Sequence, residues 1–180
     1  MLIEGYASTP DLDHSRDVVL PSAFADTIRR KPLKGPKSVK LLWQHDMQRP
    51  LGRILELKIR NDGLFMRAEI DEEISGGRDA AAVLKAVGGL SFSIGYRIMD
   101  ADIGQDANGH EYLILTKLEL YEVSVVTQPC NDECFMTFAG DPQEKLAHEI
   151  GKLKGLFEPA PTDLATAVAQ FKRLTEELRQ

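Results

Sequence analysis

The chain has 180 residues and a mass of 20.0 kDa, which fits one domain or one domain with a short appendage. Hydrophobic residues make up 43% and charged residues 28%, a composition typical of globular rather than disordered proteins. The net charge of −6 argues against a dedicated nucleic-acid-binding protein, because such proteins cluster Lys and Arg. Short apolar runs and the lack of a signal-peptide pattern predict a soluble intracellular protein without a nucleic-acid or membrane partner.

The first 138 residues indicate mainly strands joined by short turns. Alternating residues around 61–63 (Asn-Asp-Gly) predict a β-hairpin. Helices are predicted over 23–30 and over 78–87, the second ended by two glycines at 88–89. The predicted strands cover 2–8, 38–44, 54–60, 64–70, 90–99 and a strand pair over 111–120 and 121–127. This pattern favours a mainly β (α+β) fold, as an antiparallel barrel or sandwich.

Composition changes after Phe138, which predicts a first domain over 1–138 and a C-terminal helical segment over 139–180. Two amphipathic helices are expected there, one starting at Asp141-Pro142 and one over 162–178. They either pack on the protein's own sheet or pair with another subunit.

Cys130 and Cys134 form a single C-x3-C, which supplies only two zinc ligands with no histidine at finger spacing. Free thiols in a reducing compartment are the better interpretation, so no metal is expected.

His45 differs from the other three histidines because it follows an apolar strand, 39–44, and precedes a loop. A strand end is a rigid base from which an imidazole can project into a cleft and act as a general base. By itself the residue is more often structural.

Ser91 and Ser93 share one face of the predicted strand 90–99 with Gly95. Gly95 removes bulk beside Ser93, as a site that admits a peptide carbonyl needs. Ser93 is then either a hydrogen-bonded sheet residue or a nucleophile, and a nucleophilic serine needs a base such as histidine.

Glu122 lies within an apolar strand, where alternation places it beside Leu120 and Ser124. A carboxylate there needs a partner, because burial of an unpaired charge is costly. That partner is either an arginine, Arg97 or Arg53, or the ring N–H of a histidine, which Glu122 would then orient.

Several short blocks follow one another in a distinctive order: Gly-Tyr-Ala-Ser at 5–8, Trp-Gln-His-Asp at 43–46, Leu-Ser-Phe-Ser-Ile-Gly-Tyr at 90–96 and Tyr-Glu-Val-Ser-Val-Val-Thr at 121–127. Over residues 1–138 the chain resembles the prohead (capsid maturation) proteases of tailed bacteriophages, serine peptidases related in fold to the herpesvirus assemblins. The resemblance implies a small antiparallel β-barrel surrounded by helices.

The resemblance also implies a catalytic triad of His45, Ser93 and Glu122, with Ser91 as the alternative nucleophile. Acyl transfer needs donors for the oxyanion; backbone N–H groups are expected to supply them, and Arg97, four residues after Ser93, is a candidate helper. No cofactor is implied.

By the same resemblance, the expected partners are the major capsid protein with its scaffold segment and the chain itself, through autocleavage. The reaction would occur inside the immature capsid (prohead) in the host cytoplasm, and a homo-oligomer, such as a dimer, is expected. Two alternatives stay open: an inactive assembly or scaffolding protein that retains the fold, and a binding module unrelated to proteolysis.

Overall fold

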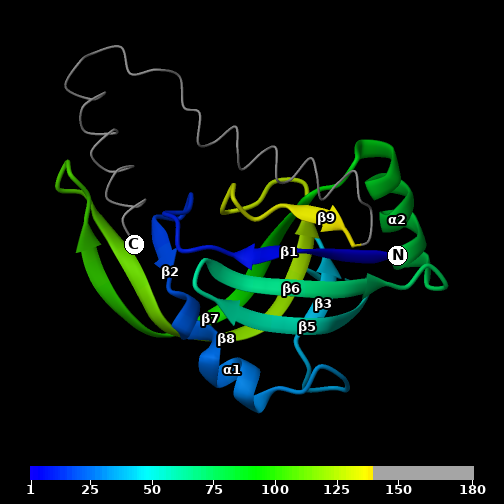
Figure 1. The fold of residues 1–180 in the computed structure, drawn as a ribbon, viewed down its shortest axis with the longest axis horizontal. Coiled ribbons are helices and arrows are strands. Elements are labelled where there is room, and N and C mark those ends of the chain that lie inside the picture. Colours follow the sequence, from blue (N-terminus) through cyan, green and yellow to red (C-terminus); the bar gives the residue numbers. More distant parts are fainter. Residues whose placement is uncertain (140–180) are drawn as a thin grey trace, which may run out of the picture. The chain divides into compact units, whose positions relative to one another are not determined.

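The computed structural model describes residues 1–139, which belong to one compact unit. Its strands form two sheets, accompanied by short helices (Figure 1). The elements in chain order are β1 (Leu2–Ser8), β2 (Asp17–Val19), η1 (Pro21–Phe24), α1 (Ala25–Arg30), β3 (Lys40–Trp43), β4 (Asp46–Pro50), β5 (Gly52–Arg60), β6 (Gly63–Ile70), α2 (Ser75–Val87), β7 (Ser91–Gln105), β8 (Glu111–Val126) and β9 (Met136–Phe138). The two predicted C-terminal helices lie outside the described residues.

The first sheet is antiparallel, with the order β5-β6-β1-β9. It contains the predicted hairpin, formed by β5 and β6, in which Arg60 pairs with Gly63 across a short turn. The alternation of the two strands buries Ile54, Leu64, Met66 and Ala68. The hairpin prediction is confirmed, although β5 begins two residues earlier than expected.

The second sheet has the order β2-β8-β3-β4, and β7 pairs with the other edge of β8. Both β2 and β3 run parallel to β8, whereas β7 runs antiparallel to it. The expectation of a small closed antiparallel barrel is therefore wrong for residues 1–139. These strands form two open sheets, and two of the strand pairs are parallel.

Strand β8 is one continuous strand of 16 residues, not the predicted pair of strands. Its pairing with β7 slips where Gly95 faces Glu122 and Tyr96 faces Leu120, so Tyr121 is the extra residue of a β-bulge. Directly paired residues share a face, so Leu120 and Glu122 lie on opposite faces. The prediction from simple alternation that Glu122 lies beside Leu120 is therefore wrong, because the bulge places them on opposite faces.

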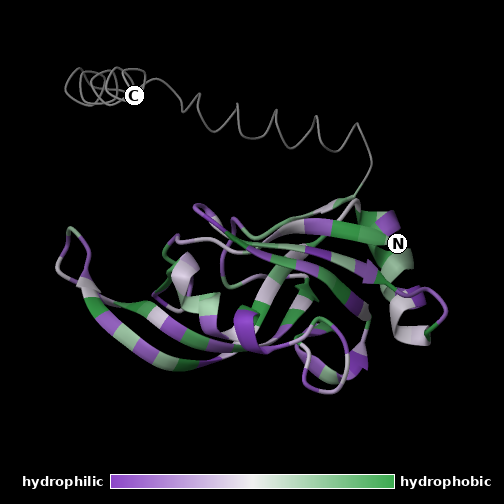
Figure 2. Cartoon of the chain, turned by 60° about the horizontal axis from the view of Figure 1, so that its bottom comes forward, coloured by the Kyte–Doolittle hydropathy of each residue, from purple (hydrophilic) through white to green (hydrophobic). Residues whose placement is uncertain are grey.

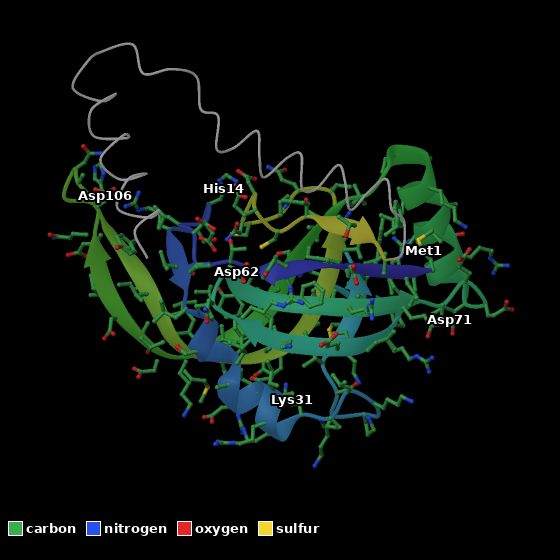
Figure 3. The ribbon with its side chains drawn as sticks, in the orientation of Figure 1. Met1, His14, Lys31, Asp62, Asp71 and Asp106 are labelled. Carbon is green, nitrogen blue, oxygen red and sulfur yellow. The ribbon has the colours of Figure 1, made fainter. Side chains whose placement is uncertain are left out.

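The far halves of β7 and β8 form an arm that ends at the turn near Asp106 (Figures 1 and 3), and β2 pairs with β8 along this arm at residues 113–115. Hydrophobic and hydrophilic residues alternate along it (Figure 2). Ile103 near the tip of this arm is 68% exposed, so the tip contributes little to the core. The core lies instead where the two sheets meet, and its fully buried side chains include Ile3, Phe24, Leu41, Leu51, Leu64, Met66, Phe92, Leu115, Leu120, Val123 and Val125.

Thr27 of α1 joins this helix to the bulged part of β8. Its hydroxyl donates to the carbonyl of Leu118 at 3.3 Å and accepts from the N–H of Leu120 at 3.1 Å. Thr27 is fully buried, so these bonds satisfy backbone groups beside the bulge that water cannot reach.

The other helix, α2, ends where Gly88 takes the left-handed conformation, as the predicted glycine stop requires. Within the described residues, every helix is too short or too polar to span a bilayer.

Candidate active site

His45 lies in the turn between β3 and β4 rather than at the end of a strand. Trp43 pairs with Asp46, so Gln44 and His45 are the two residues of a tight hairpin loop. Their φ angles are 54° and 60°, and positive values at both central positions are typical of a type I′ turn. The His45 N–H donates to Ser124 Oγ at 3.0 Å, which anchors the turn on β8.

The imidazole of His45 reaches the carboxylate of Glu122. The distance from Nδ1 to Oε1 is 2.7 Å, and the other carboxylate oxygen, Oε2, accepts a hydrogen bond from Ser124 Oγ, also at 2.7 Å. A carboxylate only accepts, so Nδ1 is the donor; in the neutral form of the ring, Nε2 is then the basic nitrogen.

Burial differs sharply between the two partners. The Glu122 side chain is 6% exposed, whereas the His45 side chain is 46% exposed. Both arginines considered as partners pair elsewhere: Arg97 with Glu119 at 2.9 Å, and Arg53 with Glu69 at 2.6 Å. The buried carboxylate thus obtains its partners from His45 and Ser124, an arrangement that orients an imidazole for proton transfer.

Gly95 makes room for this carboxylate. It pairs directly with Glu122 across β7 and β8. A Cβ atom at residue 95 would lie 2.1 Å from Glu122 Oε1, too close for any residue other than glycine unless the carboxylate moves. The space beside Ser93 that the sequence suggested for a substrate carbonyl is therefore occupied by Glu122.

Ser93 lies two residues before Gly95 and pairs with Ser124 of β8. It shares the sheet face of Gly95 and Glu122, because side chains alternate along a strand. Ser93 is 9% exposed, and within residues 1–139 its hydroxyl makes no hydrogen bond. Ser93 and His45 line the same pocket, of about 270 Å³.

Two other sequence candidates lie outside this pocket. Ser91 pairs with Val126 and bridges to Phe135, and it is not among the residues that line the cavity. Arg97 is exposed at its ion pair with Glu119 and does not line the cavity either. The structure thus brings together His45, Glu122 and Ser93, and separates Ser91 and Arg97 from them.

Sequence reasoning gave no role to Ser124, which contacts both His45 and Glu122. The signal available for it was its position two residues after Glu122, as a polar residue in an otherwise apolar strand. Ser124 is fully buried, so its hydroxyl requires the two hydrogen bonds that it makes here.

The pocket extends from Ser93 to the loop between β1 and β2, in which Figure 3 labels His14. Asp11 and Asp13 of this loop line it, together with Tyr96 and the thiol-bearing segment 130–134. The pKa of Tyr96 lies well above its usual value. Burial raises it most, and the nearby charges of Asp17 and Asp13 and a hydrogen bond to Asp17 act in the same direction.

Cys130 and Cys134 are free cysteines. Burial raises the pKa of Cys134 to about 12, and Asp11, Glu133 and Asp13 act in the same direction. In the part of the chain that the structure describes, no three His, Cys, Asp or Glu side chains gather as a metal site would require.

Comparison with known proteins places this chain in a family. The sequence model described as Caudovirus prohead serine protease matches residues 1–146. The chain therefore belongs to the Caudovirus prohead serine protease family, and the resemblance seen in its sequence blocks is confirmed.

Individual relatives agree with this assignment. The prohead protease of Escherichia phage T5 is 34% identical over 140 residues, which cover 76% of this chain and 62% of that protein. The capsid polyprotein of Pseudomonas phage PAJU2 is 27% identical over 142 residues, or 76% of this chain and 20% of the polyprotein. The matches thus span about three-fifths of the first relative and a fifth of the second.

A solved structure shares the fold. The KSHV protease, in complex with a hexapeptide phosphonate inhibitor, has a TM-score of 0.52 and 12% identity, over 96% of this chain and 86% of that one. The expected relation in fold to the herpesvirus proteases is confirmed.

Proposed function

We propose that this chain is a serine endopeptidase of phage capsid maturation, with Ser93, His45 and Glu122 as its triad. The observation that supports it best is the 2.7 Å bond from His45 Nδ1 to Glu122 Oε1, beside a buried serine in the same pocket. Membership of the prohead serine protease family supports the same reaction.

In this mechanism Ser93 Oγ attacks a peptide carbonyl carbon and gives its proton to His45 Nε2. The negative charge of Glu122 stabilises the imidazolium that forms. The tetrahedral intermediate breaks its C–N bond, and His45 returns the proton to the leaving amine. Water then attacks the acyl-enzyme with His45 as base, which releases the acid and restores the Ser93 hydroxyl.

Backbone N–H groups are the donors that we propose for the oxyanion. Arg97 is a weaker candidate than its place in the sequence suggested, because its guanidinium pairs with Glu119 outside the pocket. The Ser93 hydroxyl makes no bond to His45 in this state, which is usual before substrate binds, since such bonds often tighten only in the complex.

The substrates that we propose are the scaffold segment of the major capsid protein and this chain itself. The similarity to part of a capsid polyprotein supports a capsid-linked substrate. Cleavage would occur inside the prohead, in the host cytoplasm.

Enclosure of many copies in a shell raises their local concentration, so weak self-association can suffice for activity. We propose that the enzyme acts as a homo-oligomer, such as a dimer, and that segment 139–180 provides packing or subunit contacts. Equal activity per molecule in dilute and concentrated solutions would contradict this association.

Co-expression with the major capsid protein of the same phage tests the function. The wild-type chain and the Ser91→Ala variant should shorten the capsid protein, as measured by intact mass, and the Ser93→Ala variant should leave it full length. Cleavage by Ser93→Ala would refute the assigned nucleophile. Assembled proheads with uncut capsid protein in the presence of the wild-type chain would indicate an assembly role without proteolysis.

A further inference from the structure

The pocket beside Ser93 is large enough to admit a substrate side chain. Its volume of about 270 Å³ is slightly below the range of about 300–1,000 Å³ typical of small-molecule sites. Part of its wall is apolar, formed by Ala7, Val19, Phe92 and Ile94. Such a wall suits the hydrocarbon part of a side chain that enters beside the nucleophile.

Two carboxylates line the same pocket. Asp13 Oδ1 accepts hydrogen bonds from the N–H groups of Ser15 and Asp17, both at 2.9 Å, and Asp11 Oδ2 accepts one from Thr9 Oγ1 at 2.6 Å. Each aspartate therefore has one oxygen fixed by the loop. Within residues 1–139 neither Asp11 nor Asp13 forms an ion pair.

The loop that carries these aspartates is attached to the rest of the pocket. The N–H of His14 donates to the carbonyl of Cys130 at 2.9 Å, and the Asn131 side chain donates to Thr9 Oγ1 at 3.0 Å. Cys130 and Asn131 line the pocket as well. The two carboxylates are therefore held at its wall by hydrogen bonds on both sides of the loop.

The negative charges of the loop aspartates raise the pKa values of ionisable groups around the pocket. Burial, then the charge of Asp13, raises the pKa of Asp17, whose carboxylate accepts from Tyr96. The effects of Asp13 on Tyr96 and of Asp11 and Asp13 on Cys134 have the same sign. A cation in the pocket would relieve this repulsion.

Ser93 provides an independent indication of a ligand here. Its side chain is nine-tenths buried, lines the same pocket, and makes no hydrogen bond to any described residue. Buried hydroxyls are normally satisfied, so this one is placed for a group that is absent from the protein alone.

We propose that this pocket binds a basic side chain, Lys or Arg, of the substrate residue next to the scissile bond. The inference rests on the proposed peptidase function of the site. The aliphatic part of such a side chain would lie on the apolar wall while its cation meets Asp11 and Asp13, as amphipathic side chains do. An acidic substrate side chain would be repelled.

Active-site phosphonates that differ only in their side chain test this specificity. Three peptidyl diphenyl phosphonates carry a 4-aminobutyl, an n-pentyl or a 2-carboxyethyl group. Each labels a nucleophilic serine by forming an Oγ–P bond while a P–O bond to a phenoxy group breaks. Histidine takes the serine proton and passes it to the leaving phenoxide, which departs as phenol. The ammonium probe should label the wild-type chain about tenfold faster than the pentyl probe, and the carboxylate probe should be slowest.

Removal of the two charges should abolish the preference. In the Asp11→Asn/Asp13→Asn variant, the labelling rate of the ammonium probe divided by that of the pentyl probe should approach one. The control variant Asp100→Asn/Asp102→Asn, which changes two exposed aspartates on the arm, should keep the wild-type ratio. In the wild-type chain the ratio should also fall as salt rises from about 0.05 M to about 1 M, because ions screen the pocket.

The outcomes separate the two proposals. Equal labelling by all three probes, a faster carboxylate probe, or an unchanged ratio in Asp11→Asn/Asp13→Asn would overturn the basic-side-chain subsite alone. Failure of every probe to label the wild-type chain would overturn the peptidase function, and the subsite with it.

Discussion

Glu122 is held in one position by three neighbouring residues. Ser124 donates to one oxygen, His45 donates to the other, and Gly95 leaves the space that the carboxylate occupies. Because Ser124 also accepts the N–H of His45, a single buried hydroxyl connects the acid to the turn that carries the base. This network explains how a carboxylate is tolerated in an apolar strand.

The Gly95→Ala substitution tests this arrangement at residue scale. The new methyl group would lie 2.1 Å from Glu122 Oε1, so the carboxylate must leave His45. We expect reaction with a fluorophosphonate to slow by about 10³–10⁴-fold, near the loss seen when a triad carboxylate is made neutral. Stopped-flow or gel-based labelling rates measure this.

The matched control is Gly104→Ala in the same strand. The nearest atoms to its Cβ would belong to the Tyr112 side chain, near the tip of the arm and away from the site, so labelling should stay at the wild-type rate. Wild-type labelling by a folded Gly95→Ala protein would show that Glu122 does not act through His45.

Much of the site could be anticipated at this scale. Ser93 and Glu122 were distinguishable as polar residues within apolar strands, and His45 as a residue directly after one. The order of the surrounding blocks connected the three. Ser124 was not, because a strand serine gives no sign of its partner when that partner is a backbone N–H from a turn about 80 residues earlier. The role of Gly95 was misread for a similar reason, since its neighbour is across the sheet.

The elements that shape the site are a turn and a bulge. The turn at Gln44 and His45 projects the imidazole toward β8, and the bulge at Tyr121 turns Glu122 away from the face of Leu120. Thr27 of α1 satisfies the backbone of Leu118 and Leu120 beside this bulge. The helix therefore contributes to the position of Glu122 without touching it.

Thr27→Val should destabilise the protein. Valine has a similar shape but leaves a buried carbonyl and a buried N–H without partners, which costs about 1–3 kcal/mol. Urea unfolding measures the free energy of unfolding. Thr116→Val, at a half-buried strand threonine, is the control and should change it by less than about 0.5 kcal/mol. Equal stability of Thr27→Val and wild type would mean that the bulge does not depend on this hydroxyl.

Sequence patterns predicted an element best where its signal comes from residues that are close together in the chain. The hairpin over β5 and β6 and the glycine stop of α2 follow from neighbouring residues, and both were anticipated. Strands β2, β4 and β9 were missed: each has at most five residues, and all of β4 is exposed, so they lack the apolar alternation that indicates a strand. The bulge in β8 made one strand resemble two.

At the scale of the whole molecule, the order and direction of the strands depend on pairing between segments that are distant in the sequence. Alternation shows which residues share a face, but it does not show which strands become neighbours. The sequence therefore does not show that β2 and β3 pair in parallel with β8, nor that the strands of residues 1–139 form two open sheets instead of the expected antiparallel barrel.

Burial of ionisable groups near the pocket predicts that stability falls in alkaline solution. The pKa of Cys134 is raised from an ordinary value near 9 to about 12, so above pH 9 the unfolded chain loses this proton before the folded one does. The free energy of unfolding should decrease by up to about 1.4 kcal/mol per pH unit from this thiol between pH 9 and 12.

Urea unfolding at several pH values tests this linkage. Tyr96, whose pKa is also raised, adds a further decrease above pH 10 in both the wild type and a Cys134→Ala variant. The variant should therefore show a shallower slope than the wild type. Identical slopes from pH 9 to 11 would contradict the burial of a neutral thiol at this position.

The most direct test of the triad is the site of covalent modification. After reaction with diisopropyl fluorophosphate, intact mass should show one adduct, and peptide sequencing by mass spectrometry should place it on Ser93. The adduct should be absent in Ser93→Ala and form far more slowly in His45→Ala. An adduct on Ser91 or another residue, or labelling that does not depend on His45, would contradict the assignment of Ser93, His45 and Glu122.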